Sequence, residues 1–191
     1  MIRALHRAFD RRRQAGGHYA WLFNPYTGDE MVAIACDTPG FDPRDAGLVT
    51  VGAVRLTSER VLASDSLDLC LCNDDFHEGE MLGDALETLL DFVGNRPLLG
   101  WRIDATRLAI DRHLRPRFGF DLPNATLDMA QVYRREMRGA RPPRESDPSF
   151  EAFAGNPGVP MTGRGSALDE ALTVAAMYVQ LKKAALASQR C

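Results

Sequence analysis

Two cysteines set two residues apart are the first side chains in this sequence whose spacing could do chemistry. Cys70 and Cys72 fall in a run that alternates apolar and polar residues, so both project from one face of the expected strand. A structural zinc site needs four ligands, and the sequence has no second cysteine or histidine pair at zinc spacing. We therefore predict no zinc site here, and without a secretion signal we expect the thiols to be reduced.

An acidic turn with one histidine follows directly, over residues 73–80. Its carboxylates could bind a cation and His77 could act as a base, since both are groups that do this work in proteins. A short polar link between a strand and a helix is more typical of hydrated surface charge. We interpret the segment as a solvated turn, whose acidic residues are Asp74, Asp75, Glu78 and Glu80.

The residues before this turn predict three strands joined by short links. An apolar run over residues 31–36 ends at Asp37, ahead of the turn residues 38–40. A second apolar run covers residues 48–56, and residues 61–72 alternate with the period of a half-buried strand. Short links between consecutive strands indicate an antiparallel meander.

Downstream, the apolar residues change to a helical period. Residues 80–93 form an amphipathic pattern ended by a glycine, residues 97–101 read as a brief buried strand, and residues 104–114 predict a second helix. Alternating strands and helices imply parallel strands. The predicted fold class is α/β: a mixed sheet with helices on both faces. In the second helix we expect the inward residues to be Ala105, Leu108 and Ala109.

The two ends of the chain and one internal segment complete the predicted organisation. Residues 1–16 predict a basic N-terminal helix, and residues 138–165, rich in proline and glycine, predict a mobile loop. Ser166 and Asp169 have the spacing of a capping box that starts a long terminal helix. The N-terminal helix is expected to pack its apolar side on the domain through Ile2, Leu5, Ala8 and Phe9.

Composition limits the classes of protein that the chain can belong to. The 191 residues, 45% of them hydrophobic, suit a single domain, and the net charge of -3 does not indicate a general nucleic-acid binder. No apolar run approaches the roughly 20 residues that a membrane-spanning helix needs. We expect a cytoplasmic protein without a membrane partner, and the sequence leaves its oligomeric state open.

Three segments carry a resemblance to a known family. Residues 35–43 read Ala-Cys-Asp-Thr-Pro-Gly-Phe-Asp-Pro and are followed by Val-Gly-Ala-Val at 51–54, residues 98–106 read Leu-Leu-Gly-Trp-Arg-Ile-Asp-Ala-Thr, and residues 163–171 read Gly-Arg-Gly-Ser-Ala-Leu-Asp-Glu-Ala. In this order they resemble the three motifs of the DEDDh-type 3′-5′ exonuclease superfamily, which is RNase H-like and includes the DNA polymerase III epsilon proofreading subunit. The resemblance covers about residues 18–185 and implies an RNase H-like sheet of three antiparallel strands followed by parallel strands.

The resemblance also implies a chemistry and the positions that should perform it. In the family, four carboxylates hold two divalent ions and a histidine acts as the general base. Alanine, threonine and glycine stand at three of these five positions, while an aspartate and a glutamate stand at the other two. In the order of the motifs, these vestigial positions are Ala35, Asp37, Thr106, Gly165 and Glu170.

These substitutions make the chain resemble a degenerate member of the superfamily. We expect an exonuclease-like protein that is catalytically defective, needs no cofactor, and acts by binding nucleic acid or a partner protein. Asp37 and Glu170 are weak candidates for metal ligands. The alternatives are a nucleotide sensor, or an active 3′-5′ exonuclease that uses Mg²⁺ or Mn²⁺ with migrated ligands. That enzyme would draw on Asp37, Asp104, Asp169 and Glu170.

Three residues near the second motif are candidates for contact with nucleic acid. Trp101 could stack on a base, although an aromatic residue at a strand end is more often part of the core. Arg102 and Arg107 could pair with phosphates. Arg107 and Asp111 are also spaced as an ion pair within one helix, which favours an exposed, solvated charge over a binding role.

Overall fold

A computed structural model describes residues 2–37, 48–72, 78–140, 150 and 165–188 of the chain. Most of the loop expected over residues 138–165 lies outside this range, as do His77, Asp74 and Asp75 of the acidic turn. Residues 138–140, at the start of that expected loop, are helical.

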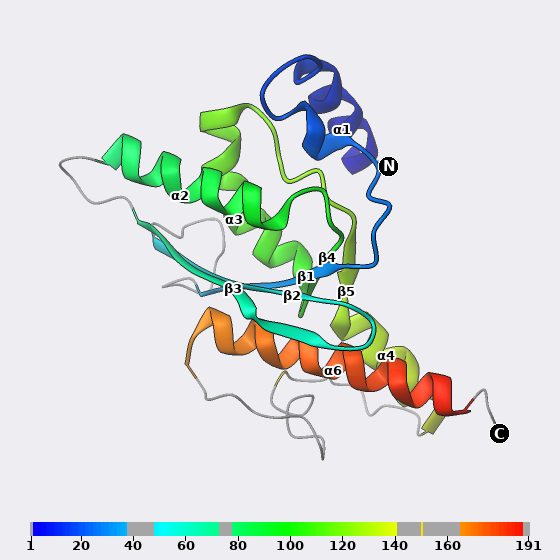
Figure 1. The fold of residues 1–191 in the computed structure, drawn as a ribbon. Helices are drawn as coiled ribbons and strands as arrows, with labels where there is room; N and C mark the ends of the chain where they lie inside the picture. The colour runs from blue at the N-terminus through cyan, green and yellow to red at the C-terminus, as the bar shows by residue number, and fades with distance from the viewer. Residues whose placement is uncertain (1, 38–47, 73–77, 141–149, 151–164, 189–191) are drawn as a thin grey trace.

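A five-stranded mixed sheet runs through the centre of the molecule in the order β3-β2-β1-β4-β5 (Figure 1). The first three strands pair antiparallel, whereas β4 and β5 continue the sheet from β1 in parallel. The predicted mixed α/β sheet is therefore confirmed, and so are the strands expected at residues 48–56 and 61–72. The five strands are β1 (Met31–Asp37), β2 (Leu48–Leu56), β3 (Val61–Cys72), β4 (Leu98–Gly100) and β5 (Thr126–Asp128).

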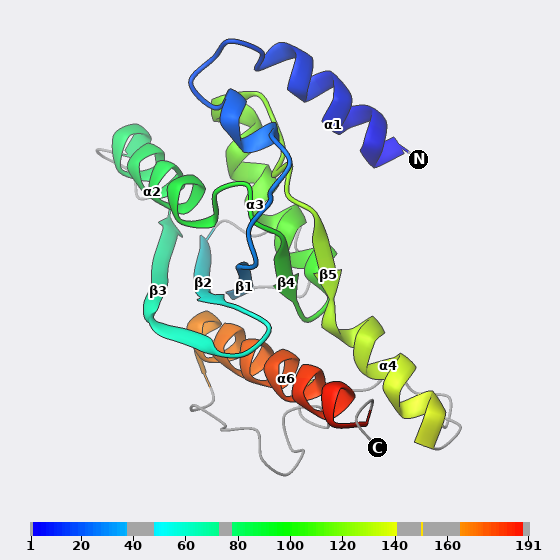
Figure 2. The same ribbon diagram turned by 45° about the vertical axis from the view of Figure 1, so that its right-hand side comes forward.

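Helices cover both faces of the sheet, as the sequence predicts. On one side lie α2 (Glu78–Val93) and α3 (Ile103–Phe118), and on the other lies α6 (Ala167–Ser188) (Figures 1 and 2). Strand β1 supplies alternate residues to the two resulting cores: Ile34 packs with Leu89 on the α2 and α3 side, and Ala35 packs with Val174 beneath α6. Helix α4 (Met129–Ala140) follows β5 directly.

Small residues in the sheet let α6 approach β1 and β2 closely. A side chain at Gly52 would clash with the backbone of Ala167 and Leu168, so only glycine fits there. The start of α6 is fixed by the predicted cap, because the Asp169 amide donates to Ser166 Oγ at 3.1 Å. The N-terminal turn of α6 is therefore held against the sheet beside Ala35, the register partner of Gly52.

The predicted inward face of α3 is wrong in phase. The helix begins at Ile103 after Arg102, which adopts a left-handed conformation with φ 50°, and it ends at Gly119. Ala109 is buried as expected, but Ala105 is exposed and Leu108 is 42% exposed. The buried face consists of Ile103, Thr106, Ala109, Ile110, Asp111 and Leu114.

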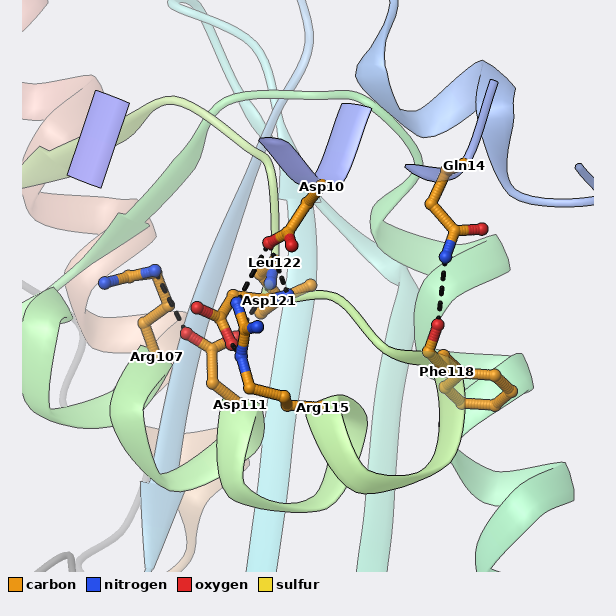
Figure 3. A network of polar contacts seen from close by, with 8 residues as sticks. All are labelled: Asp10, Gln14, Arg107, Asp111, Arg115, Phe118, Asp121 and Leu122. Atoms are coloured by element: carbon orange, nitrogen blue, oxygen red, sulfur yellow. Dashed lines mark hydrogen bonds and ion pairs between the residues drawn. The ribbon is translucent and has the colours of Figure 1, made fainter. Parts of the chain in front are cut away.

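The N-terminal helix α1 (Ile2–Arg13) docks differently from the expectation. Its apolar residues Leu5 and Phe9 are 66% and 60% exposed, so the predicted apolar packing through them is wrong. Buried Asp10 instead accepts a hydrogen bond from Arg115 Nη2 at 2.9 Å, and Gln14 Nε2 donates to the carbonyl of Phe118 at 3.0 Å (Figure 3). Polar contacts to the end of α3 therefore hold this helix. The apolar periodicity of the sequence does not mark the face that makes these contacts, so the prediction missed it.

Two further expectations concern the membrane and the thiols. Within the part of the chain that the structure describes, no helix is both long and apolar enough to cross a membrane. Cys36 is a free thiol, whereas Cys70 is disulfide-bonded. The expectation of a reduced thiol is therefore wrong for Cys70.

Candidate functional site

Two carboxylates lie near one another at the C-terminal end of β1. Asp37 is the last residue of that strand, and Glu170 lies in the first turn of α6. Burial raises the pKa of Glu170 to about 7, and the negative charge of Asp37 adds to this effect. The two residues are thus close enough for their charges to repel, with Asp37 exposed and Glu170 mostly shielded.

A cysteine thiol connects this acidic pair to α3. Cys36 lies between Ala35 and Asp37 and donates a weak hydrogen bond from Sγ to the carbonyl of Thr106 at 3.9 Å. Burial raises the pKa of Cys36, and the nearby Glu170 and Asp37 raise it further. A thiol with a raised pKa stays protonated and is a poor nucleophile, so Cys36 links two elements rather than reacting.

The structure brings most of the predicted vestigial positions to this end of β1. Ala35 is 1% exposed and packs beneath α6, and Thr106 is buried on α3 with its carbonyl against Cys36. Gly165 is exposed, has φ 145° and directly precedes the Ser166 cap, so it lies at the same end of α6 as Glu170.

These residues do not fit a centre for two divalent ions. Magnesium prefers near-octahedral oxygen coordination, and two ions close together need several anionic ligands to offset their repulsion. The site offers the carboxylates of Asp37 and Glu170, while Ala35 has no ligand atom. Among the described residues, no group of three or more histidine, cysteine, aspartate or glutamate side chains could hold a metal ion. Asp104 and Asp169 are described and form no such group.

Trp101 and Arg107, two of the candidate nucleic-acid contacts near the second motif, make contacts within the protein, whereas Arg102 is exposed. Trp101 is 8% exposed, and its ring lies 5.8 Å from Phe150 and 6.4 Å from Tyr133, centroid to centroid. The backbone amide of Arg102 donates to Asp128 Oδ1 at 3.1 Å. Arg107 forms the predicted helical ion pair with Asp111 at 3.0 Å, but Asp111 is buried and Arg107 largely so, and the expected exposed, solvated charge is therefore wrong.

A second set of buried polar groups was not anticipated from the sequence. Asp10 Oδ2 accepts from Arg115 and from the Asp121 amide, and Asp111 Oδ1 accepts from the Leu122 amide at 2.7 Å (Figure 3). These contacts join α1, α3 and the segment that leads to β5. The one available signal was Asp10 itself, a single acidic residue in an otherwise basic helix.

The fold and site define a mixed α/β domain with an acidic pair at the C-terminal end of its central strand. Comparison of the chain with protein-family models and with curated proteins finds no match. A functional assignment for this chain thus has to begin from its fold and from the position of Asp37 and Glu170.

Proposed function

We propose that the chain is a degenerate RNase H-like domain of the DEDDh exonuclease type, and that it acts by binding nucleic acid or a partner protein without nuclease turnover. The sheet order supports the fold part of this proposal, because three antiparallel strands are followed by two parallel ones. The order of the three motif-like segments, at residues 35–43, 98–106 and 163–171, supports the family part.

The burial of Ala35 is the observation that most directly supports the proposed loss of nuclease activity. The resemblance assigns this position to a carboxylate that bridges two metal ions, yet its methyl group is packed in the core under α6. The backbone of Ala167 and Leu168 also lies directly against Gly52, the register partner of Ala35. The position has lost its ligand atom, and its methyl group is part of the core.

The base position supports the same conclusion. The resemblance assigns it to Gly165, which has no side chain to accept a proton. A hydrolytic nuclease needs both an activated water and charge stabilisation of the transition state. With neither the bridging carboxylate nor the base, the residues at this site can bind a ligand but lack the groups for hydrolysis.

A nuclease assay tests the proposal directly. We expect no release of mononucleotides above background from single-stranded or double-stranded DNA or RNA, with either magnesium or manganese. The matched control is Asp37→Ala, which removes the exposed carboxylate of the site and should leave that background unchanged. Turnover that Asp37→Ala abolishes would replace this proposal with the alternative, an active exonuclease with migrated ligands.

A further inference from the structure

A cavity of about 880 Å³ lies between α1 and the loops that lead into the parallel strands. Residues just before β1, β4 and β5 contribute to it, including Tyr26, Pro97 and Ala125. These are the N-terminal ends of the strands, whereas Asp37 lies at the C-terminal end of β1. The seven residues of β1 separate the two places by about 20 Å at the usual rise of an extended strand.

One wall of this cavity is strongly basic. Arg7, Arg11 and Arg12 of α1 line it, and its described lining contains no acidic side chain. None of the three arginines forms an ion pair with a carboxylate among the described residues. Arg7 and Arg11 are one helical turn apart, so they lie on neighbouring positions of one helix face. A protein with a net charge of -3 thus concentrates around one hollow three arginines that form no ion pair within the described residues.

The placement of α1 explains why these arginines face the cavity. The helix leaves Leu5 and Phe9 exposed and docks through Asp10 and Gln14 (Figure 3). Burying a carboxylate is costly unless it is paired, so this contact is a specific one that fixes the orientation of the helix. The fixed orientation holds the basic side of α1 over the loops before the strands.

The opposite wall combines amide groups with apolar surface. Asn24 offers a hydrogen-bonding side chain and Pro25 and Pro97 offer apolar contact, whereas the amide nitrogen of Asn95 donates to the carbonyls of Asn24 and Pro25. The volume is in the range of small-molecule sites, about 300–1,000 Å³. A ligand that fits has several negative charges at one end and an apolar or planar group at the other.

We propose that this cavity binds a small molecule carrying a diphosphate group, of the class of nucleoside diphosphates. Guanidinium groups form paired hydrogen bonds with phosphate oxygens, and adjacent arginines match two linked phosphates better than one carboxylate. The apolar and amide wall faces the nucleoside. The site is independent of the acidic pair at Asp37 and does not rest on the proposed loss of nuclease activity.

Calorimetric titration of the full chain with ADP, at constant ionic strength, tests the proposal. We expect saturable binding of ADP and of pyrophosphate, with orthophosphate weaker by about tenfold or more because it engages fewer guanidinium groups. Arg7→Gln with Arg11→Gln should weaken ADP binding by about tenfold or more. The matched control is Arg13→Gln with Arg60→Gln, which makes the same charge change outside the cavity lining and should alter the affinity by less than about twofold.

A second variant guards against displacement of α1 by the arginine substitutions. Asn24→Asp places a carboxylate on the opposite wall, where it repels a diphosphate without removing any contact of α1. It should also weaken ADP binding, with an unchanged melting temperature. Three results would overturn the proposal: no saturable ADP binding at millimolar concentration, equal weakening in the control pair, or arginine-dependent binding of an oligonucleotide without binding of ADP.

Discussion

The charge of Glu170 near neutral pH depends strongly on its surroundings. Its pKa rises from 4.5 to about 7 because the carboxyl group is mostly buried and lies near Asp37. Between these two values the unfolded chain has released the proton while the folded chain retains it. The free energy of unfolding therefore falls as the pH rises through this window, and the loss is complete above about pH 7.

Glu170→Gln should remove this pH dependence. We expect the variant to gain stability relative to the native chain between pH 4.5 and pH 8 by about 1–3 kcal/mol, since one pKa unit corresponds to about 1.36 kcal/mol. Urea denaturation at the two pH values measures the difference. Glu59→Gln, in the exposed turn after β2, is the control and should show no such gain. Identical behaviour of the two variants would mean that Glu170 is not buried beside Asp37.

At the scale of the elements, Gly52 sets how closely α6 lies on the sheet. Gly52→Ala should destabilise the protein by about 3 kcal/mol or more, because the added methyl group meets backbone atoms of α6 that cannot rotate away. Thermal or chemical denaturation measures the effect. A variant as stable as the native chain would show that α6 does not approach β2 in this way, and would also remove the argument that Ala35 is covered.

The docking of α1 depends on one buried carboxylate. Asp10→Asn keeps the shape of the side chain but removes its charge, so we expect a loss of about 1–2 kcal/mol from the contact with Arg115. This is less than a fully buried ion pair would lose, because the Arg115 side chain is partly exposed and retains its bond to Asp121.

Limited digestion with trypsin reports on the same contact, since α1 contains several arginines. Cleavage within α1 should be faster in Asp10→Asn than in the native chain, because a helix that opens locally is open to proteolysis. Asp84→Asn, which changes an exposed aspartate of α2, serves as the control. Equal cleavage rates in all three proteins would contradict the docking of α1 through Asp10.

The elements with strong periodicity could be predicted from the sequence, and those with weak periodicity could not. The strands at 48–56 and 61–72 and helix α2 follow clear apolar patterns, and the cap at Ser166 fixes the start of α6. In helix α3 the apolar residues are spread around the helix and the buried face includes polar Thr106 and Asp111, so its sequence does not mark one inward face clearly.

The site could be predicted only as far as its motif order allowed. The order of the motifs predicts Asp37 and Glu170 at one site, and in the structure the charge of Asp37 helps to raise the pKa of Glu170. The hydrogen bond from Cys36 to the carbonyl of Thr106 on α3 has no sequence signal. The burial of Ala35 under α6 depends on how closely that helix approaches the sheet, and the sequence signal for a close approach is Gly52 within a strand. The basic cavity was missed because α1 docks through polar residues.

At the scale of the whole molecule, opposite charges gather at opposite ends of the parallel strands. Asp37 and Glu170 lie at the C-terminal end of β1, and Arg7, Arg11 and Arg12 surround the cavity at the other end. An anionic ligand is therefore favoured at the cavity and repelled at the acidic pair. Binding of a divalent cation would be the corresponding test of the acidic end.

A melting experiment with metal ions separates a vestigial acidic site from a working one. A site saturated at about 100 times its dissociation constant adds roughly 2.7 kcal/mol of stability, which for a domain of this size raises the melting temperature by roughly 5–10 °C. Two carboxylates supply too little negative charge for a pair of divalent ions. We therefore expect millimolar magnesium or manganese to raise the melting temperature by less than about 2 °C.

The control for this experiment is the double variant Asp37→Asn with Glu170→Gln. Because Glu170→Gln changes stability by itself, the quantity to compare is the shift that the metal causes in each protein, measured at one pH. Weak binding of ions to surface carboxylates should give the same small shift in both proteins. A large shift in the native chain that the double variant abolishes would mean that the acidic pair binds metal. The interpretation of the acidic site as vestigial would then be wrong, and the nuclease assay would decide whether the bound metal supports turnover.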